Sequence, residues 1–209
     1  MKARTTGLKR RVLWQGAYIR AVVLTYPDRL GRARQWEAVE RVNCSGIVVI
    51  VPVTPQEDIL LIRQFRPALN RTVIEFPAGL GEPGETLAEA ARRELVEETG
   101  HDSADLCLLT EGPLSSGLSS EMLTVFLARN VEPASPEMLA RHTPEETEEI
   151  QLITMPLREV HERLAAAGRR RKDLVDMKVF GLAELAKRML ERCGASPAAK
   201  RHNARGKEK

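Results

Sequence analysis

The sequence predicts an α/β/α sandwich built on a mixed sheet and preceded by a small β-rich N-terminal subdomain. An almost continuous run of Ile and Val at 46–53 is typical of a strand that is buried on both faces. The segment 87–99 contains no Gly or Pro and is rich in Ala, Leu, Glu and Arg, which predicts a helix. Short β-rich stretches separated by turn residues make up most of the remainder, so strands outnumber helices.

The first element is a β-rich stretch at 13–26, predicted as one strand that a turn at 26–31 joins to a partner strand at 35–42. This hairpin forms the predicted N-terminal subdomain, residues 1–43. Six further strands are predicted in the domain that follows, at 46–53, 58–65, 72–76, 104–109, 122–128 and 150–155.

The C-terminal part of that domain, which spans 44–193, is predicted to be helical. A polar, acidic, Pro-containing stretch at 131–147 predicts a loop, and amphipathic patterns predict helices at 157–167 and 174–193. Residues 194–209 are rich in Ala, Lys and Arg without an apolar period, so a disordered basic tail is expected.

Composition limits the function classes. The chain has 209 residues, a formal net charge of +3 and no long apolar run, so neither a membrane span nor a secretory signal is expected. Cys44, Cys107 and Cys193 are widely spaced and odd in number, which favours reduced thiols in a cytoplasmic protein. The basic tail lacks interleaved aromatic residues, so a solubilising role is favoured over nucleic-acid binding.

A glycine-rich loop leads into the helix predicted at 87–99. Thr86 and Glu89 form a T-x-x-E capping box, and Gly100 stands where a glycine commonly ends a helix. Apolar residues recur every four positions at Leu87, Ala91 and Leu95 and give the helix a face for the core.

A second face of this helix is acidic. Glu94, Glu97 and Glu98 stand at i, i+3 and i+4, so their carboxylates are neighbours that repel one another unless cations intervene. Oxygen-only ligands favour a hard cation, Mg²⁺ or Mn²⁺. The alternative is a solvated acidic face whose partners are Arg92 and Arg93.

The segment 79–101 resembles the Nudix box, G-x5-E-x7-R-E-U-x-E-E-x-G-U, where U is apolar; only His101 departs from it. The matching residues are Gly79, Glu85, Arg93, Glu94, Leu95, Glu97, Glu98 and Gly100. The resemblance implies metal-dependent hydrolysis of a nucleoside diphosphate linked to another group. It also implies that Glu94, Glu98 and the Ala78 carbonyl hold Mg²⁺, with Glu97 on a further ion or a water and Arg93 in the catalytic machinery. Glu85 would support the loop.

The stretch 64–79, with Arg66, Glu75 and Ala78, looks like the ADP-ribose pyrophosphatase branch of that family. This likeness implies hydrolysis of ADP-ribose to AMP and ribose 5-phosphate by a homodimer that exchanges N-terminal strands. Arg41 and Arg66 would contact the diphosphate and ribose, and Glu75 would orient the loop or assist binding.

The same likeness implies an aromatic pair that stacks on adenine, assigned to Tyr18 and Trp36, with Trp14 as a rival and ordinary burial as the alternative. A general base is expected on the loop before the last central strand, assigned to Glu148. Its competitors, Glu145, Glu146 and Glu149, lie in the same loop.

One departure bears on the substrate. Ser116 stands where this branch often carries a proline that is associated with ADP-ribose preference. Hydrolysis of GDP-mannose or of another nucleotide sugar or dinucleotide therefore stays open. A non-catalytic nucleotide-binding module is a further alternative.

Overall fold

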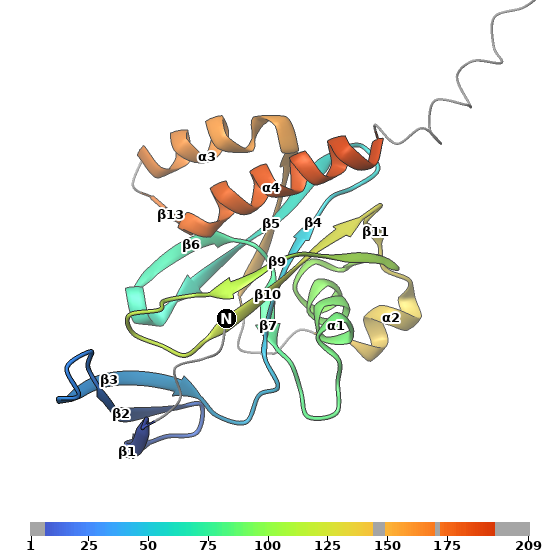
Figure 1. The fold of residues 1–209 in the computed structure, drawn as a ribbon. Coiled ribbons are helices and arrows are strands. Elements are labelled where there is room, and N and C mark those ends of the chain that lie inside the picture. Colours follow the sequence, from blue (N-terminus) through green and yellow to red (C-terminus); the bar gives the residue numbers. More distant parts are fainter. Residues whose placement is uncertain (1–6, 144–148, 170–171, 195–209) are drawn as a thin grey trace, which may run out of the picture.

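The computed structural model describes residues 7–143, 149–169 and 172–194. Figure 1 shows a body of strands with helices on two sides and a separate sheet below it. The expected mixed α/β sandwich with an N-terminal β unit is confirmed. No helix in the described ranges is long and apolar enough to cross a membrane.

The N-terminal unit is a three-stranded antiparallel sheet in the order β1 (Lys9–Gln15), β2 (Ile19–Pro27) and β3 (Ala33–Arg41). The prediction of one strand at 13–26 was therefore wrong, because a turn at 16–18 divides it. The Gly16 N–H donates to the Ile19 carbonyl at 2.8 Å, which closes this turn. The Trp14 ring lies so close to Gly16 that a Cβ there would overlap with it.

Two four-stranded sheets form the body. One has the order β7 (Ala78–Leu80), β4 (Ile47–Pro52), β10 (Met122–Arg129) and β9 (Asp105–Pro113). The other has the order β12 (Ile150–Pro156), β5 (Asp58–Arg66), β6 (Arg71–Glu75) and β13 (Leu174–Val175). The sheets are mixed because β10 runs parallel to β4 and β13 runs parallel to β6.

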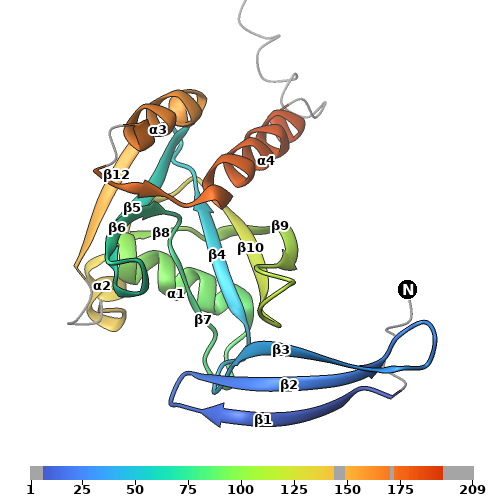
Figure 2. The ribbon, with the colours of Figure 1, turned by 90° about the vertical axis from the view of Figure 1, so that its left-hand side faces the viewer.

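The helices cover opposite sides of the body, with α1 (Leu87–Thr99) and α2 (Pro136–Arg141) away from α3 (Val160–Arg169) and α4 (Met177–Gly194) (Figure 2). Two short 3₁₀ turns, η1 (Pro67–Leu69) and η2 (Leu157–Glu159), precede β6 and α3. A two-stranded ladder pairs β8 (His101–Asp102) with β11 (Glu132–Pro133).

Strand β4 is buried on both faces, as its sequence predicts. Val49 and Val51 pack in the core cluster that includes residues of α3 and α4, whereas Val48 and Ile50 pack in the cluster that includes residues of α1. This alternation follows from the two-residue period of a strand. Because β4 is fixed from both sides, β7 and α1 are anchored firmly against it.

Two predictions for the C-terminal part were wrong in detail. The stretch predicted as loop contains β11 and α2, whose N-cap is Ser135. The helix predicted from residue 174 begins only at Met177, because Leu174 and Val175 pair with β6. The Asp176 carboxylate accepts the Lys178 N–H at 2.8 Å and caps α4.

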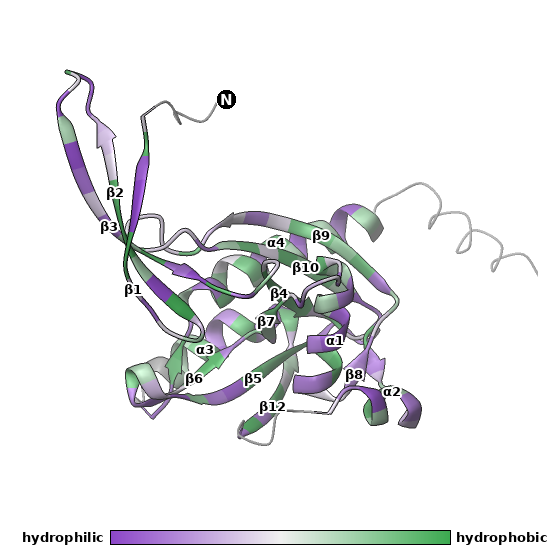
Figure 3. Cartoon of the chain, turned by 90° about the horizontal axis from the view of Figure 1, so that it is seen from below, coloured by the Kyte–Doolittle hydropathy of each residue, from purple (hydrophilic) through white to green (hydrophobic). Residues whose placement is uncertain are grey.

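The N-terminal sheet contacts the body through the segment between β9 and β10. The Val39 N–H donates to the Leu118 carbonyl at 2.9 Å, and the Ser120 N–H donates to the Val39 carbonyl at 3.1 Å. Away from this attachment the sheet projects from the body, with apolar and polar residues interspersed along its strands (Figure 3).

Candidate active site

Helix α1 is fixed at both ends by the signals its sequence contains. The Thr86 hydroxyl accepts the Glu89 N–H, and the Glu89 carboxylate accepts the Thr86 N–H at 2.8 Å, so the capping box is confirmed. Gly100 ends the helix with a left-handed φ of 66°. Ala91 and Leu95 are fully buried and hold α1 against the body.

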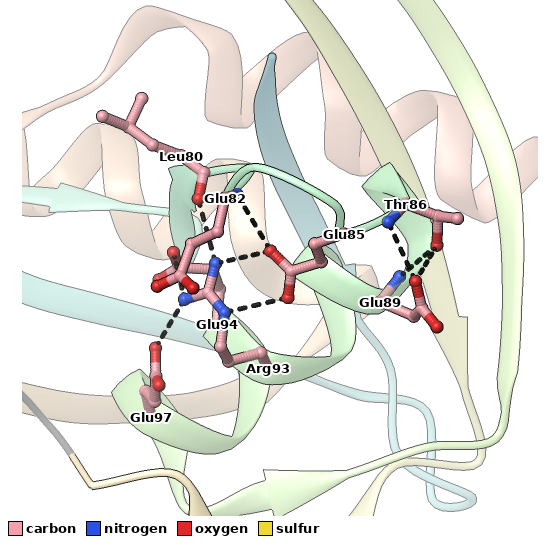
Figure 4. A network of polar contacts seen from close by, with 8 residues as sticks. All are labelled: Leu80, Glu82, Glu85, Thr86, Glu89, Arg93, Glu94 and Glu97. Carbon is pink, nitrogen blue, oxygen red and sulfur yellow. Dashed lines mark hydrogen bonds and ion pairs between the residues drawn. The ribbon is translucent and has the colours of Figure 1, made fainter. Parts of the chain in front are cut away.

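Arg93 lies at the centre of a network of acceptors on α1 and the preceding loop (Figure 4). Its Nη1 donates to Glu94 at 2.8 Å and to Glu97 at 2.9 Å. Its Nε and Nη2 donate to the two oxygens of Glu85 at 3.0 and 3.1 Å, and Nη2 also donates to the Leu80 carbonyl at 2.9 Å. The side chain of Arg93 therefore holds two of the three clustered carboxylates in place.

The charges of this network stabilise one another. Burial alone would lower the pKa of Arg93, but its hydrogen bonds to Glu85, Glu94 and Glu97 outweigh burial and raise that pKa above its usual value. Burial alone would likewise raise the pKa of Glu85, but hydrogen bonds from Arg93 and from the Glu82 N–H lower it. Both groups are therefore charged at neutral pH.

Strand β7 approaches the acidic face of α1 closely. A Cβ at Gly79 would overlap with the Glu94 carboxylate where Arg93 holds it, so glycine allows Glu94 to keep this position. The Glu98 carboxylate accepts the Ala78 N–H at 2.8 Å. Sequence alone placed Gly79 in the motif; the contact with Glu94 gives the physical reason for it.

The acidic face and Arg93 line a cleft of about 450 Å³ that also contains two further arginines. Arg41 comes from the end of β3 and Arg66 from the end of β5, and both line the cleft together with Ala78 and the acidic trio Glu94, Glu97 and Glu98. The structure thus brings together six side chains or backbone positions that the sequence assigned to metal and diphosphate. Cationic groups facing an acidic cluster are the arrangement that a metal–diphosphate complex requires.

Each arginine of the cleft is held by a carboxylate. Arg66 Nε donates to Glu75 at 2.7 Å, and Arg41 Nε donates to Glu121 at 2.8 Å. Glu75 was expected to orient the glycine-rich loop or to assist binding, and both roles stay predictions beside its contact with Arg66. Asn43 also lines the cleft, and neither it nor Glu121 had an assigned role. The stretch Ser119-Ser120-Glu121, an S-x-E pattern after the box, is the sequence signal for Glu121.

The donor set suits a hard cation, although the carboxylates do not converge on one point. Among the described residues, no three acidic, His or Cys side chains surround a common position. The reason is visible in the contacts, since Arg93 takes up Glu94 and Glu97 while the Ala78 N–H takes up Glu98. Oxygen-only ligands on one helix face, opening on a cleft, fit Mg²⁺ or Mn²⁺.

The two residues assigned to adenine stacking do not meet within one chain. The Val42 N–H donates to the Tyr18 carbonyl at 3.0 Å, whereas Trp36 pairs with Leu24 in the β2–β3 ladder. Val42 lies six residues beyond Trp36 along the chain, or about 20 Å at the usual rise of a strand. The two side chains are 72% and 48% exposed, and the rival Trp14 is 58% exposed.

The remaining assignments concern two loops. Glu148, Glu145 and Glu146 lie outside the described residues, and Glu149 is exposed just before β12. Ser116 is the second residue of a turn that the Leu118 N–H closes on the Ser115 carbonyl at 2.9 Å. Proline is favoured at this position of a β-turn, so the serine occupies a place that a proline would fit.

Comparison with known proteins places this site in a family. A model of the NUDIX domain matches residues 45–176. The ADP-sugar pyrophosphatase of Mus musculus is 32% identical over 189 residues, covering 81% of this chain and 82% of that protein. The chain belongs to the Nudix family. It is a Nudix hydrolase, as the box at 79–101 predicts.

Further relatives agree with this Nudix assignment. The ADP-ribose pyrophosphatase of Bacillus subtilis is 39% identical over 101 residues, which are 48% of this chain and 53% of that protein. A crystal structure of an ADP compounds hydrolase superposes with a TM-score of 0.70 over 92% of this chain and 99% of the other. Since these two chains are 19% identical, that likeness concerns the fold.

Proposed function

We propose that this Nudix hydrolase cleaves the diphosphate bond of an ADP-sugar, with ADP-ribose as the preferred substrate and AMP and ribose 5-phosphate as products. The observation that supports it best is the cleft that Arg41 and Arg66 line together with the acidic trio. The name of the Mus musculus relative favours an ADP-sugar, and the name of the Bacillus subtilis relative favours ADP-ribose.

Glu94, Glu97, Glu98 and the Ala78 carbonyl would hold Mg²⁺, or Mn²⁺ in its place. The cation would neutralise the diphosphate and acidify a bound water. Arg93 is a positioning residue in this proposal, because its described contacts are to β7, to the loop that follows β7 and to α1. Glu85 holds Arg93 in turn, so the carboxylates start the reaction already oriented.

Arg41 and Arg66 would bind the diphosphate oxygens. A guanidinium grips phosphate with two parallel hydrogen bonds and keeps its charge at any physiological pH. Glu121 and Glu75 would hold these guanidinium groups in place through the hydrogen bonds that they accept. Glu148 stays the predicted general base, which would take a proton from the attacking water.

The N-terminal subdomain, 1–43, would bind the nucleoside and form a homodimer with exchanged N-terminal strands. Support comes from large apolar side chains that are at least 39% exposed on or beside its sheet. They are Leu8, Val12, Leu13, Trp14, Tyr18, Ile19, Leu30 and Trp36. In such a dimer, Tyr18 of one chain and Trp36 of the other could reach the same adenine, which the two residues of a single chain do not.

We also propose a cytoplasmic location, on the basis of the cysteines. Cys44, Cys107 and Cys193 are all free thiols, and Cys193 is exposed. Free and exposed thiols persist in a reducing compartment.

A screen of substrates tests the function. Each compound is incubated with Mg²⁺ or Mn²⁺ and a phosphomonoesterase, and released phosphate is measured. The substrates are ADP-ribose, GDP-mannose, NADH, FAD and diadenosine polyphosphates. ADP-ribose is expected to give the highest kcat/KM, and a preference for GDP-mannose would replace the proposed substrate. Absence of hydrolysis with every compound and both metals would contradict the proposal.

A further inference from the structure

A second cavity lies beside the cleft that contains the acidic trio. Its volume is about 190 Å³, and it shares Ile47, Arg66 and Ala78 with the cleft as common wall residues. Because Arg66 lines both spaces, a group attached to a phosphate near Arg66 can enter this side pocket without leaving the cleft.

The floor of the side pocket is apolar and its rim is charged. Phe76, Leu123 and Val179 on the floor are 3%, 7% and 1% exposed and belong to the larger core cluster. The rim carries two ion pairs, Arg66 with Glu75 and Lys178 with Asp176. An apolar floor under a few charged groups is the usual composition of a small-molecule site.

The position of Asp176 and Lys178 is fixed by the backbone. The Asp176 N–H donates to the Ile74 carbonyl at 2.9 Å, so the start of α4 is tied to β6 beside the pocket. Asp176 has a structural role as the N-cap of α4. Lys178 pairs with this N-cap carboxylate, although a cation in the first turn by itself opposes the helix dipole.

We propose, on the basis of the function above, that this side pocket binds the sugar ring that leaves as the sugar phosphate. Asp176 and Lys178 contact the hydroxyl groups of that ring and determine which sugars are accepted. The C–H face of the ring packs on Phe76 and Leu123, and Arg66 contacts the phosphate that the sugar carries away.

Two properties of the pocket favour a sugar ring over a nucleoside. Its volume lies below the roughly 300–1,000 Å³ of pockets for larger ligands, so it suits one ring. Its charged rim offers both an ammonium donor and carboxylate acceptors, and neighbouring hydroxyl groups can satisfy both kinds. The nucleoside would then bind at the other end of the cleft, near Arg41, the last residue of β3 in the N-terminal sheet.

The test compares substrates with and without the sugar. Lys178→Met removes the charge but keeps the apolar stem, and Asp176→Asn removes the charge but keeps a residue type that caps helices well. Lys187→Met, an exposed position on the same helix, is the matched control. For each protein kcat/KM is measured with ADP-ribose and with the methyl ester of ADP, in which a methyl group replaces the sugar.

The ratio of the two kcat/KM values is expected to fall about tenfold in Lys178→Met, as for a lost hydrogen bond to a charged group. A smaller fall is expected in Asp176→Asn and none in Lys187→Met. Binding of ribose 5-phosphate, measured by calorimetry, is expected to weaken in parallel. An unchanged ratio with unchanged ribose 5-phosphate binding overturns the sugar pocket while the hydrolase function stands. If the wild-type protein hydrolyses neither compound, the proposed function fails, and ribose 5-phosphate binding alone decides the pocket.

Discussion

Helix α1 with its preceding loop differs from the N-terminal sheet in where its side chains find their contacts. Arg93 of α1 has four carboxyl or carbonyl partners within the same segment, and Ala91 and Leu95 are fully buried. The N-terminal sheet instead exposes large apolar side chains such as Trp14, Tyr18 and Leu30. The helix makes these contacts within one chain, whereas the sheet exposes the apolar surface on which the proposed dimer and nucleoside site rest.

The largest effect is expected for a substitution in the acidic trio of helix α1. Glu98→Gln should lower kcat at least a thousandfold, because a neutral amide is a poor ligand for a hard cation. Glu89→Gln on the same helix is the control, since glutamine also supports a capping box. Circular dichroism should show both variants folded. Turnover of Glu98→Gln at the wild-type rate would remove Glu98 from the site.

Removal of the Arg93 guanidinium should lower the stability of the fold. Arg93→Met leaves Glu85, Glu94 and Glu97 close together without their counter-ion, so the free energy of unfolding should fall by about 3–5 kcal/mol. Urea unfolding measures the loss. Arg188→Met, which breaks an exposed pair on α4, should leave the urea midpoint close to that of the wild type. Equal losses in the two variants would show that the Arg93 network is no stronger than a surface ion pair.

The N-terminal sheet should respond in substrate affinity. Trp36→Ala and Tyr18→Ala should each raise the KM for ADP-ribose by about 10- to 100-fold, the loss of one stacking contact of about 1–3 kcal/mol. If the two residues meet only in a dimer, the KM of the wild type should also rise at protein concentrations at which the dimer dissociates. Sedimentation measures the fraction of dimer at each concentration. If KM is unchanged in both variants, the nucleoside binds elsewhere.

A smaller effect of pH is expected within that sheet. Hydrogen bonds from Arg10, and then from Arg20, outweigh burial and hold the pKa of Glu40 well below its usual range, at about 2. A lowered pKa stabilises the folded state above the unfolded value of about 4.3, and this stabilisation is lost as the pH falls toward 2. Glu40→Gln should therefore cost about 1 kcal/mol at pH 7, after allowance for the partly exposed Arg10.

Unfolding of the wild type and of Glu40→Gln, followed between pH 7 and pH 2.5, measures this difference. The two stabilities should converge as the pH falls below about 4.3. A difference that stays constant over this interval would show that the carboxylate of Glu40 is not the source.

Helix α1 could be predicted to the residue because its signals are local. Thr86, Glu89 and Gly100 specify its ends through contacts within a few residues. The first predicted strand is divided at Gly16 by a turn that lies inside a β-rich stretch. Strand propensity alone does not predict a turn at such a position. Strand β7 has three residues and exists because it pairs with β4, which is far away in sequence.

The site shows the same distinction between local and non-local information. The spacing of Glu94, Glu97 and Glu98 predicted one acidic face, and the position of Arg66 in its motif predicted a place in the cleft. The role of Arg93 as their common counter-ion depends on the path of the loop, which brings Glu85 and the Leu80 carbonyl back to α1. The pairing of Arg41 with Glu121 joins residues 80 positions apart.

The central claim is that the acidic trio on α1 binds the divalent cation used in hydrolysis. A titration of Mn²⁺, followed by electron paramagnetic resonance, tests it in the wild type, in Glu94→Gln and in Glu98→Gln, with Glu89→Gln as control. The wild type and the control are predicted to bind Mn²⁺ equally well. The Mn²⁺ affinity of Glu94→Gln and Glu98→Gln is predicted to be at least tenfold lower. Equal Mn²⁺ affinity in all four proteins would contradict it.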